Sequence, residues 1–556
     1  MKKTNLIISC IYIALFLVGT RALLHGFPDI ERFFGEWADE RMTLTYIMKF
    51  GTLNFAPTQI VHPPLYHYLT FIPIGIFFVI GKLLGLFSDR IDFIRFYFNN
   101  THYFFLIGRA MSYIFYWLSA LFIFKICRLF YEKNISHITT FAFLLIPRFI
   151  ADFSTTRPET LLFLNSSIFL YLLLRYYLDD RNEKFLYLSA LFLGVSTATK
   201  YNALFLGFVF VPLLIEQWRK QRPDIRGLIT KTFKIGLFTF LGFFICNPFF
   251  IIKFTTYFYN LYIFDTVWIN YVYKGYSPSL FIITRIKDLI STLYLNLFGF
   301  IVLILGFWNL VRKDKRMAFS FLAIFLLFEI YFSLLHKSCS PTYYLNPLIA
   351  MAALIFASGV DFLLNKRRQF VLILIMFFVI SFFNYYVHLR DLSARPTYLQ
   401  EARAFIEKNI SEFSNICIAS DNNLPQLNMT RASYNHLIQT FPGVVSKDKD
   451  IDISFRPMDS DENYDSIFRE LRIQSLMKKP QYNLIRWDKK ISSEEEAVLF
   501  LRKHNIKYIM ANGEVSVGSK KLKDLKIVTL VREYSPNNTR VYEDNNFYLY
   551  KVNPLD

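Results

Sequence analysis

Long runs of apolar residues recur along the first 387 positions of the chain, separated by short charged stretches. A helix needs about 20 apolar residues to cross a bilayer. This criterion predicts about eleven transmembrane helices, some of them short. They lie at 5–23, 104–125, 138–152, 160–178, 184–199, 201–216, 233–250, 286–310, 317–335, 344–363 and 369–387. The first has no clear small-residue cleavage site, so we interpret it as a retained helix and not a signal peptide.

Residues 65–87 are also apolar enough to span, and their placement decides the side of every later loop. If they form a re-entrant or surface-lying helix, the inside loops hold 21 Lys and Arg against 8 Asp and Glu. The longer outside loops then hold 16 against 12. Because cytoplasmic loops carry the excess of Lys and Arg, we predict this arrangement. The N-terminus is then inside, and a first loop at 24–103 lies outside.

From residue 388 onward the pattern changes to that of a soluble domain. Residues 399–410 and 493–505 have helical periodicity, whereas 415–420, 507–512, 526–534 and 547–552 are typical of strands. The sequence therefore predicts two domains. A mainly α, polytopic membrane domain occupies residues 1–387, and a small extracytoplasmic α/β domain occupies 388–556.

Composition agrees with this division and removes several classes of function. Hydrophobic residues make up 54% of the 556 positions and aromatic residues 19%, which excludes a disordered chain, a collagen-like fibre and a disulfide-rich scaffold. The net charge is +19, of which +17 belongs to residues 1–387. The basic charge is thus read as a topology signal, and no nucleic-acid partner is expected. No CxxC, HExxH, Walker or GxGxxG motif occurs.

Two groups of polar residues in the first loop are candidates for chemistry. Asp29, Glu31 and Glu36 suit the solvated face of a surface helix. The pair Asp39-Glu40 begins a helical stretch, and one of the two must face inward. His62 precedes Pro63 and Pro64, which rigidly start a helix. A helix cap with an interfacial histidine explains His62 equally well.

Further candidates lie at the predicted outer ends of later helices. They are Arg157, Glu159, Lys200, His336, Lys337 and Tyr343, with Glu329 inside a predicted span. Taken singly, Glu159 is explained as an acid at a helix N-terminus, and Lys200 is explained as a lysine at a membrane end that reaches toward lipid headgroups. Cations that converge opposite acids would instead form a phosphate site.

The order of these features resembles that of the GT-C membrane glycosyltransferases, specifically the group of protein O-mannosyltransferases and the lipid A aminoarabinose transferase. The segments that carry the resemblance are Asp39-Glu40, LTYIMKFGTLNF, HPPLYHYL, GRAMSYIFYWLSALFIFKICRLFY, RPETLLFL, LGVSTATKYNALFL and KSCSPTYYLNP. The chain departs from the aminoarabinose transferases, which have Lys-Pro at His62-Pro63. It also has Glu159 where the second-loop acid is usually Asp.

The resemblance implies a GT-C fold with surface-lying helices in the first outer loop. It further implies an inverting transfer of one sugar from polyprenyl phosphate to a lipid, polysaccharide or protein acceptor, in the cell membrane and on its extracytoplasmic side. Asp39 would be the catalytic base, with Glu40 beside it. Arg157, Lys200 and Lys337 would surround the phosphate, with His62, His336 and Tyr343 as further substrate contacts. Glu159 would orient the acceptor or, with His62, help to hold a divalent metal ion.

Two other functions remain open. Transporters or flippases of lipid-linked sugars tend to have internal repeats and polar residues at the midplane. This chain shows no internal repeat, keeps its candidate acids in outer loops and carries a large outer tail. An en bloc oligosaccharyltransferase would usually carry a larger outer domain with its own acceptor-recognition motif. Both are less consistent with the sequence than the transfer of a single sugar.

Overall fold

A computed structural model describes the chain at residues 2–24, 38–52, 55, 63–179, 182–221, 225–255, 287, 290–291, 295–331, 346–366, 371–393, 397–419, 427–433, 436, 444–445, 452–453, 471, 474, 477, 480–487, 491–512, 515–517, 520–534 and 547–554. These residues are mostly helical, and strands are concentrated near the C-terminus. The chain divides into two compact units. Unit 1 comprises residues 1–23, 56–72 and 107–389, and unit 2 comprises 24–55, 73–106 and 390–556.

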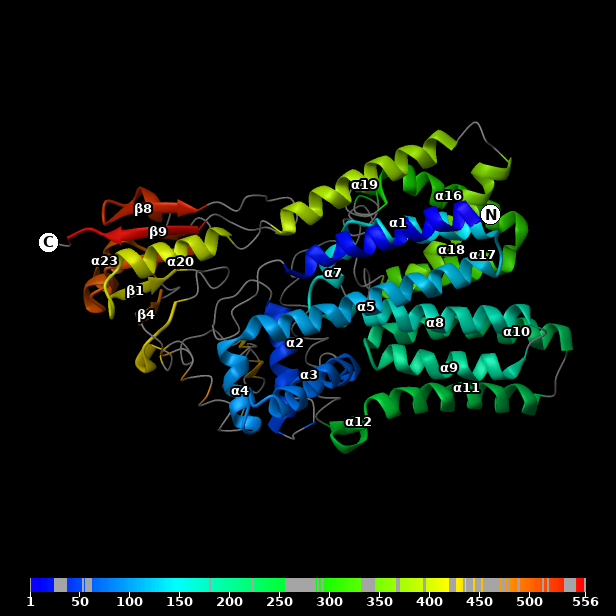
Figure 1. Ribbon diagram of the computed structural model, residues 1–556, viewed down its shortest axis with the longest axis horizontal. Helices are drawn as coiled ribbons and strands as arrows, with labels where there is room; N and C mark the ends of the chain where they lie inside the picture. The colour runs from blue at the N-terminus through cyan, green and yellow to red at the C-terminus, as the bar shows by residue number, and fades with distance from the viewer. Residues whose placement is uncertain are drawn as a thin grey trace. The chain divides into compact units, whose positions relative to one another are not determined.

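Unit 1 is a bundle of helices, drawn in Figure 1. Its helices are α1 (Lys2–Thr20), α6 (Lys133–Leu144), α7 (Arg148–Phe153), α8 (Glu159–Leu178), α9 (Glu183–Thr197), α10 (Phe210–Gln221), α11 (Ile225–Cys246), α12 (Phe249–Ile252), α16 (Asn296–Lys313), α17 (Lys315–Glu329), α18 (Ile349–Asp361) and α19 (Val371–Ser393). Helices α3 (Leu65–Leu83) and α5 (Thr101–Arg128) belong to both units. The 3-10 segments η1 (Arg21–Leu24) and η3 (Tyr201–Val209) complete it, together with a π-helical turn at Phe362–Lys366.

Within the described residues, eight helices are long and apolar enough to cross a membrane. Seven coincide with predicted spans, which confirms a polytopic membrane protein. The eighth is Leu65–Leu83, which we expect on the membrane surface; its placement stays a prediction.

The other four predicted spans correspond to shorter helical elements. The span 138–152 divides into α6 and α7 at Pro147, because a proline lacks the N–H group that an unbroken helix requires. The span 201–216 begins as the 3-10 helix η3 before it continues as α10. The spans 184–199 and 317–335 contain α9 and α17, each with 15 residues.

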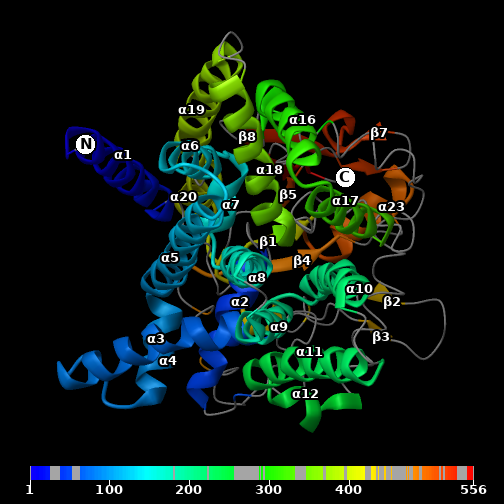
Figure 2. The same cartoon turned by 90° about the vertical axis from the view of Figure 1, so that its right-hand side faces the viewer.

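Helix α9 packs between α8 and α11, as the view in Figure 2 shows. Gly194 and Gly242 allow α9 and α11 to approach closely. A Cβ atom on Gly194 would lie 2.0 Å from the Thr239 carbonyl oxygen, and one on Gly242 would lie 2.1 Å from that of Leu191. Small residues at a helix crossing are typical of membrane bundles, where close packing drives association. The backbone contact fixes α9 relative to α11.

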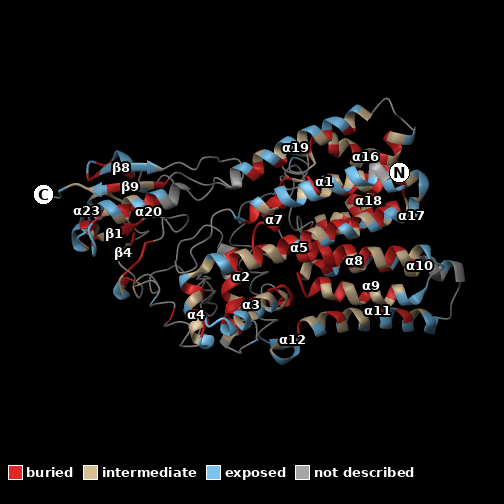
Figure 3. Ribbon diagram, in the orientation of Figure 1, coloured by how far each residue is buried: buried red, intermediate tan, exposed pale blue. Residues whose placement is uncertain are grey.

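The burial pattern singles out α8 in unit 1. Figure 3 shows buried residues on most of α8, whereas α11 exposes many of its side chains. Apolar side chains exposed along α11 include Ile229, Phe233 and Ile245. Such a surface suits contact with lipid, so α8 forms the interior of the bundle and α11 its periphery.

In unit 2, the segments before residue 107 include α2 (Ala38–Lys49), η2 (Phe50–Thr52) and α4 (Arg90–Asn99). Asp89 caps α4 by accepting hydrogen bonds from the backbone N–H groups of Ile91 and Asp92. Rings of the second half of α3 pack against α4, for example Phe77 on Phe93 with centroids 6.0 Å apart. Aromatic packing thus holds these first-loop helices together.

The C-terminal part of unit 2 is an α/β domain, as the sequence predicts. Its five-stranded sheet has the order β4 (Asn483–Arg486), β1 (Asn415–Ile418), β5 (Tyr508–Asn512), β9 (Phe547–Val552) and β8 (Val528–Tyr534). The first three strands are parallel, and the other two are antiparallel to their neighbours. Two small sheets pair β2 (Val444–Val445) with β3 (Asp452–Ile453) and β6 (Ser516–Val517) with β7 (Lys520–Lys521). The 3-10 turn η10 (Leu522–Asp524) precedes β8.

The two faces of the large sheet have separate cores. Ile416 of β1 packs in one core with Ile406 of α20 (Thr397–Asn409). Cys417 packs in the other core with Leu501 of α23 (Glu494–Lys503). This alternation follows from the two-residue period of a strand, and it places one helix on each face. Strand β4 is the one member of the large sheet that the sequence analysis does not predict.

Candidate active site

A buried ion pair joins two of the predicted site residues. The Nζ atom of Lys200 donates a hydrogen bond to Oε1 of Glu159 over 2.9 Å. Each side chain is only 8% exposed. Because two charges removed from water must compensate each other, this pair is unlike an ordinary surface salt bridge. Residues 41 positions apart in the sequence are therefore brought together at one end of α8.

Local structure explains how the pair is positioned. Glu159 is the first residue of α8, directly after Pro158, where an acid complements the helix dipole. Lys200 follows the end of α9 in extended conformation and precedes η3. A second link lies nearby: the side-chain amide of Asn165 donates to Oγ1 of Thr199 over 2.9 Å. The start of α8 and the end of α9 are thus held together by two polar contacts.

Further charged residues surround this pair. Asp152 of α7 is buried, with 1% of its surface exposed, and interacts electrostatically with Arg148, Glu159, Arg157 and Lys200. These five residues form a cluster of three cations and two acids, which we call the charged cluster.

The segment after the His62-Pro63-Pro64 motif also reaches this region. Leu65 and Tyr66 share a core with Leu161 of α8 and Ala198 at the end of α9. The Tyr66 hydroxyl is 2.7 Å from Oγ of Ser112 in α5. Because Leu161 and Ala198 each lie two residues from a member of the ion pair, the start of α3 packs beside the charged cluster.

Helix α5 anchors two other pieces of chain in this region. The guanidinium of Arg109, which is fully buried, donates to the carbonyl of Leu23 over 3.1 Å. One residue earlier, a Cβ atom on Gly108 would lie 2.5 Å from the side chain of Thr156, which precedes Arg157. The end of η1, the start of α3 and the segment that contains Arg157 therefore all contact one part of α5.

The remaining predicted site residues are placed only in part. Glu40 of α2 is fully buried. Asp39 lies in α2, and its side chain is not among those described. His62, His336, Lys337 and Tyr343 lie outside the described residues. Glu329 ends α17, with Oε1 buried.

The described residues do not fit a metal ion by themselves. Among them, no group of three His, Cys, Asp or Glu side chains gathers as metal ligands would. Glu159, which the sequence suggests as a ligand, accepts a hydrogen bond from Lys200. No step of the chemistry below is assigned to a metal.

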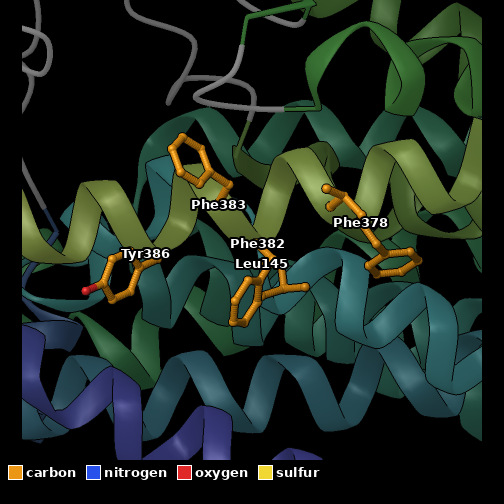
Figure 4. A pocket seen from close by; sticks show the side chains of 6 residues that line it. Leu145, Phe378, Phe382, Phe383 and Tyr386 are labelled. Carbon is orange, nitrogen blue, oxygen red and sulfur yellow. The ribbon is translucent and has the colours of Figure 1, made fainter.

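An apolar groove lies along α19. It encloses about 570 Å³ and is lined by Leu145, Phe378, Val379, Phe382, Phe383 and Tyr386, five of which are labelled in Figure 4. The groove contains almost no polar surface, and none of its residues belongs to the charged cluster. It suits a hydrocarbon chain, whereas the polar chemistry belongs to the charged cluster.

Two members of the charged cluster, Asp152 and Arg148, are missed by the sequence analysis. Asp152 is the last residue of the predicted span 138–152, where an acid resembles the polar end of a helix. The feature that could have identified Asp152 in the sequence is its closeness to Glu159, which follows seven residues later with a proline between the two. Arg148 lies inside the same predicted span, where an ionisable residue is expensive and often functional.

Comparisons with known proteins agree with this reading. Residues 105–251, about a quarter of the chain, match the family described as dolichyl-phosphate-mannose-protein mannosyltransferase. This range contains every member of the charged cluster. The match confirms the resemblance for these residues. No curated protein matches the chain.

Solved structures of low sequence identity are also similar to the chain. ArnT from Cupriavidus metallidurans in the apo state has a TM-score of 0.46 and 11% identity, with 99% of this chain and 98% of that chain covered. The same protein bound to undecaprenyl phosphate has a TM-score of 0.46 and 10% identity, with coverages of 100% and 99%. The Archaeoglobus fulgidus oligosaccharyltransferase with Zn and sulfate has a TM-score of 0.44 and 13% identity, with coverages of 90% and 67%.

Proposed function

We propose that the protein moves a single sugar, with inversion, from a polyprenyl-phosphate donor to an acceptor hydroxyl or amine on the extracytoplasmic side of the cell membrane. The observation that carries the proposal is the charged cluster, which lies within the residues that match the mannosyltransferase family. The cluster has three cations against two acids, so its net charge is positive, and Lys200, Glu159 and Asp152 in it are buried. It therefore suits the phosphate of a lipid-linked sugar.

The cations stabilise the leaving group in this proposal. As the bond between the sugar and the phosphate breaks, negative charge develops on the polyprenyl phosphate. In this proposal Lys200 and Arg157 would balance that charge, and Lys337 is a further candidate from the sequence. Since Lys200 donates to Glu159, an arriving phosphate competes with the Glu159 carboxylate for the same ammonium group.

The acceptor must lose a proton as it attacks the anomeric carbon, so one carboxylate acts as the base. We assign this role to Asp39, on the resemblance that the acidic pair carries. The buried Glu40 would hold the start of α2 in place, and Glu159 would orient the acceptor. His62, His336 and Tyr343 remain candidates for substrate contacts. The apolar groove on α19 is a candidate for the isoprenoid chain, which is hydrocarbon along its length.

A transfer assay with the purified full chain in liposomes tests this function. Polyprenyl-phosphate mannose and polyprenyl-phosphate pentoses serve as donors, with a membrane-lipid fraction and a peptide mixture as acceptors. We expect Asp39→Asn to fold normally and to lose about 10²- to 10⁴-fold in transfer, the usual contribution of a general base. Glu36→Gln is a matched change of an acid that the sequence predicts on the solvated face of a helix in the same loop, and it should leave the rate unchanged.

Three other outcomes would each contradict a different part of the proposal. Full activity of Asp39→Asn would remove Asp39 as the base. Transfer from lipid-linked oligosaccharides but from no single-sugar donor would favour en bloc transfer. Movement of intact donor across the bilayer without transfer would favour a flippase.

A further inference from the structure

Asp152 is the acid in the charged cluster that no proposed step uses. Its Oδ2 atom is fully buried and makes no hydrogen bond within the described part of the chain. Glu159, the other acid of the cluster, accepts a hydrogen bond from Lys200 over 2.9 Å. The two carboxylates differ in one respect: Oε1 of Glu159 lies within hydrogen-bond distance of a cation, whereas Asp152 has no such contact at Oδ2. Each also has a buried oxygen, Oε2 of Glu159 and Oδ2 of Asp152, that makes no hydrogen bond among the described residues.

The backbone around Asp152 is held by local contacts. Phe153, the next residue, packs its ring against Tyr116 and Tyr113 of α5, with centroids 4.9 and 5.0 Å apart. The backbone N–H of Ser154 donates to the carbonyl of Ile150, and the Thr155 hydroxyl donates to that of Ala151. The end of the short helix α7 is thus packed against α5 at the residue that follows Asp152.

A buried carboxylate oxygen that lacks a hydrogen-bond donor is destabilising, and more so when the group is charged. Arg148, Arg157 and Lys200 offset the charge of Asp152 from a distance. None of the three supplies a hydrogen bond to Oδ2. A carboxylate so placed would repel a phosphate oxygen, but it would accept a hydrogen bond from a hydroxyl group. In a phosphate-linked sugar, hydroxyl groups lie directly beside the phosphate.

We propose that Asp152 is a specificity-determining residue that accepts a hydrogen bond from a hydroxyl group of the donor sugar, while the cations of the charged cluster bind the adjacent phosphate. This inference rests on the proposed function and deepens it. It assigns the sugar and the phosphate of one donor to different members of the same cluster.

Equilibrium binding to the purified full chain in liposomes tests the inference with two probes. One probe is bare polyprenyl phosphate, and the other is polyprenyl-phosphate mannose. We expect Asp152→Ala to weaken binding of the mannose probe by about tenfold to a hundredfold, the range for a hydrogen bond to a charged group. The same variant should bind bare polyprenyl phosphate as well as wild type or more tightly, since a negative charge near the phosphate is gone.

Asp152→Asn separates the hydrogen bond from the charge. It removes the charge but keeps an acceptor oxygen, so its loss of mannose-probe binding should be smaller than that of the alanine variant. Thermal melting of both variants shows whether they fold. A residue with only a structural role would change the binding of both probes together.

Deoxymannose versions of the second probe identify the hydroxyl group. One deoxymannose probe should bind the wild-type protein more weakly than the mannose probe does. The Asp152→Ala variant should bind that deoxy probe and the mannose probe equally, because the hydrogen bond is already absent. If each deoxy probe loses the same amount of affinity for the wild-type protein and for the variant, Asp152 binds no hydroxyl group of the sugar and the inference is wrong. If the wild-type protein binds the donor and transfers the sugar, and both Asp152 variants bind the two probes with wild-type affinity, the inference about Asp152 is wrong and the proposed function stands. If wild type binds neither probe, the proposed function fails with it.

Discussion

Two Lys–Glu ion pairs of equal length lie at opposite ends of the same helix. Lys200, just after α9, pairs with Glu159, and Lys231 of α11 pairs with Glu183, the first residue of α9. Both nitrogen–oxygen distances are 2.9 Å. In the first pair both side chains are 8% exposed, whereas Glu183 in the second is 52% exposed. We call them the buried pair and the open pair.

The neighbours of the two pairs also differ. The buried pair shares its surroundings with the buried acid Asp152. The open pair has an aromatic ring and a further cation nearby: the Lys231 nitrogen lies 5.8 Å from the centroid of Tyr176, and Lys234 interacts electrostatically with Glu183. An ion pair with an exposed carboxylate contributes little beyond holding a helix end in place. Because both pairs have the same length and charged neighbours, burial is what distinguishes the candidate site from a structural pair.

The largest expected difference between the two pairs is in transfer rate. Lys200→Met should lower sugar transfer by about a hundredfold, as the loss of one preorganised donor does in other enzymes. Lys231→Met makes the same chemical change in the open pair and should stay within about twofold of wild type. Initial rates with the preferred donor measure both.

A control is needed because Lys200→Met leaves Glu159 buried without its partner, which is destabilising in itself. The double variant Lys200→Met with Glu159→Gln removes both charges. If that variant folds and transfers sugar at the wild-type rate, the buried pair has only a structural role, as the open pair does.

The next largest effect concerns the packing that holds α9 between the two pairs. Gly194→Ala places a methyl group against the backbone of α11, where Thr239 O would be only 2.0 Å away, so we expect a loss of about 1–3 kcal/mol in stability. Gly236→Ala on α11 is the matched control, since nothing lies within 4 Å of its Cβ position. Because alanine favours a helix over glycine by about 1 kcal/mol, this variant should be neutral or stabilised. Thermal melting in detergent measures both; equal melting temperatures would contradict the close contact.

The smallest effect is the pH dependence of the open pair. The hydrogen bond from Lys231 lowers the pKa of Glu183, which precedes the predicted span 184–199, below its ordinary value. Its stabilisation is therefore present above the ordinary pKa of a glutamate and is lost as the pH falls through the lowered value. We expect the melting temperature of Glu183→Gln to fall less between pH 7 and pH 3 than that of wild type. Parallel melting curves for the two proteins would show that the pair contributes nothing measurable.

Much of the architecture is predictable because it depends on local patterns. Runs of apolar residues give seven of the spans, and period-two alternation gives β1, β5, β8 and β9. The 3-10 segment η3 is not predicted, since a continuous apolar run such as YNALFLGFV does not reveal its helical period. Strand β4 is missed because its four residues, NLIR, are too short for a clear alternation.

The candidate site is predictable only in its separate parts. The sequence identifies Glu159 and Lys200 one at a time, but their contact depends on the packing of α8 against α9. Asp152 escapes prediction because an acid at the end of an apolar run resembles the boundary of a span. Its distinguishing property, a buried oxygen among cations, exists only in three dimensions.

The central claim is that the buried pair belongs to a phosphate site and the open pair does not. The most direct test is the equilibrium binding of bare polyprenyl phosphate to wild type, Lys200→Met and Lys231→Met in liposomes. We predict that Lys200→Met weakens binding about tenfold or more, the scale of a hydrogen bond between charged groups, while Lys231→Met binds as wild type does. Equal binding by all three proteins, or an equal loss in both variants, would contradict the claim.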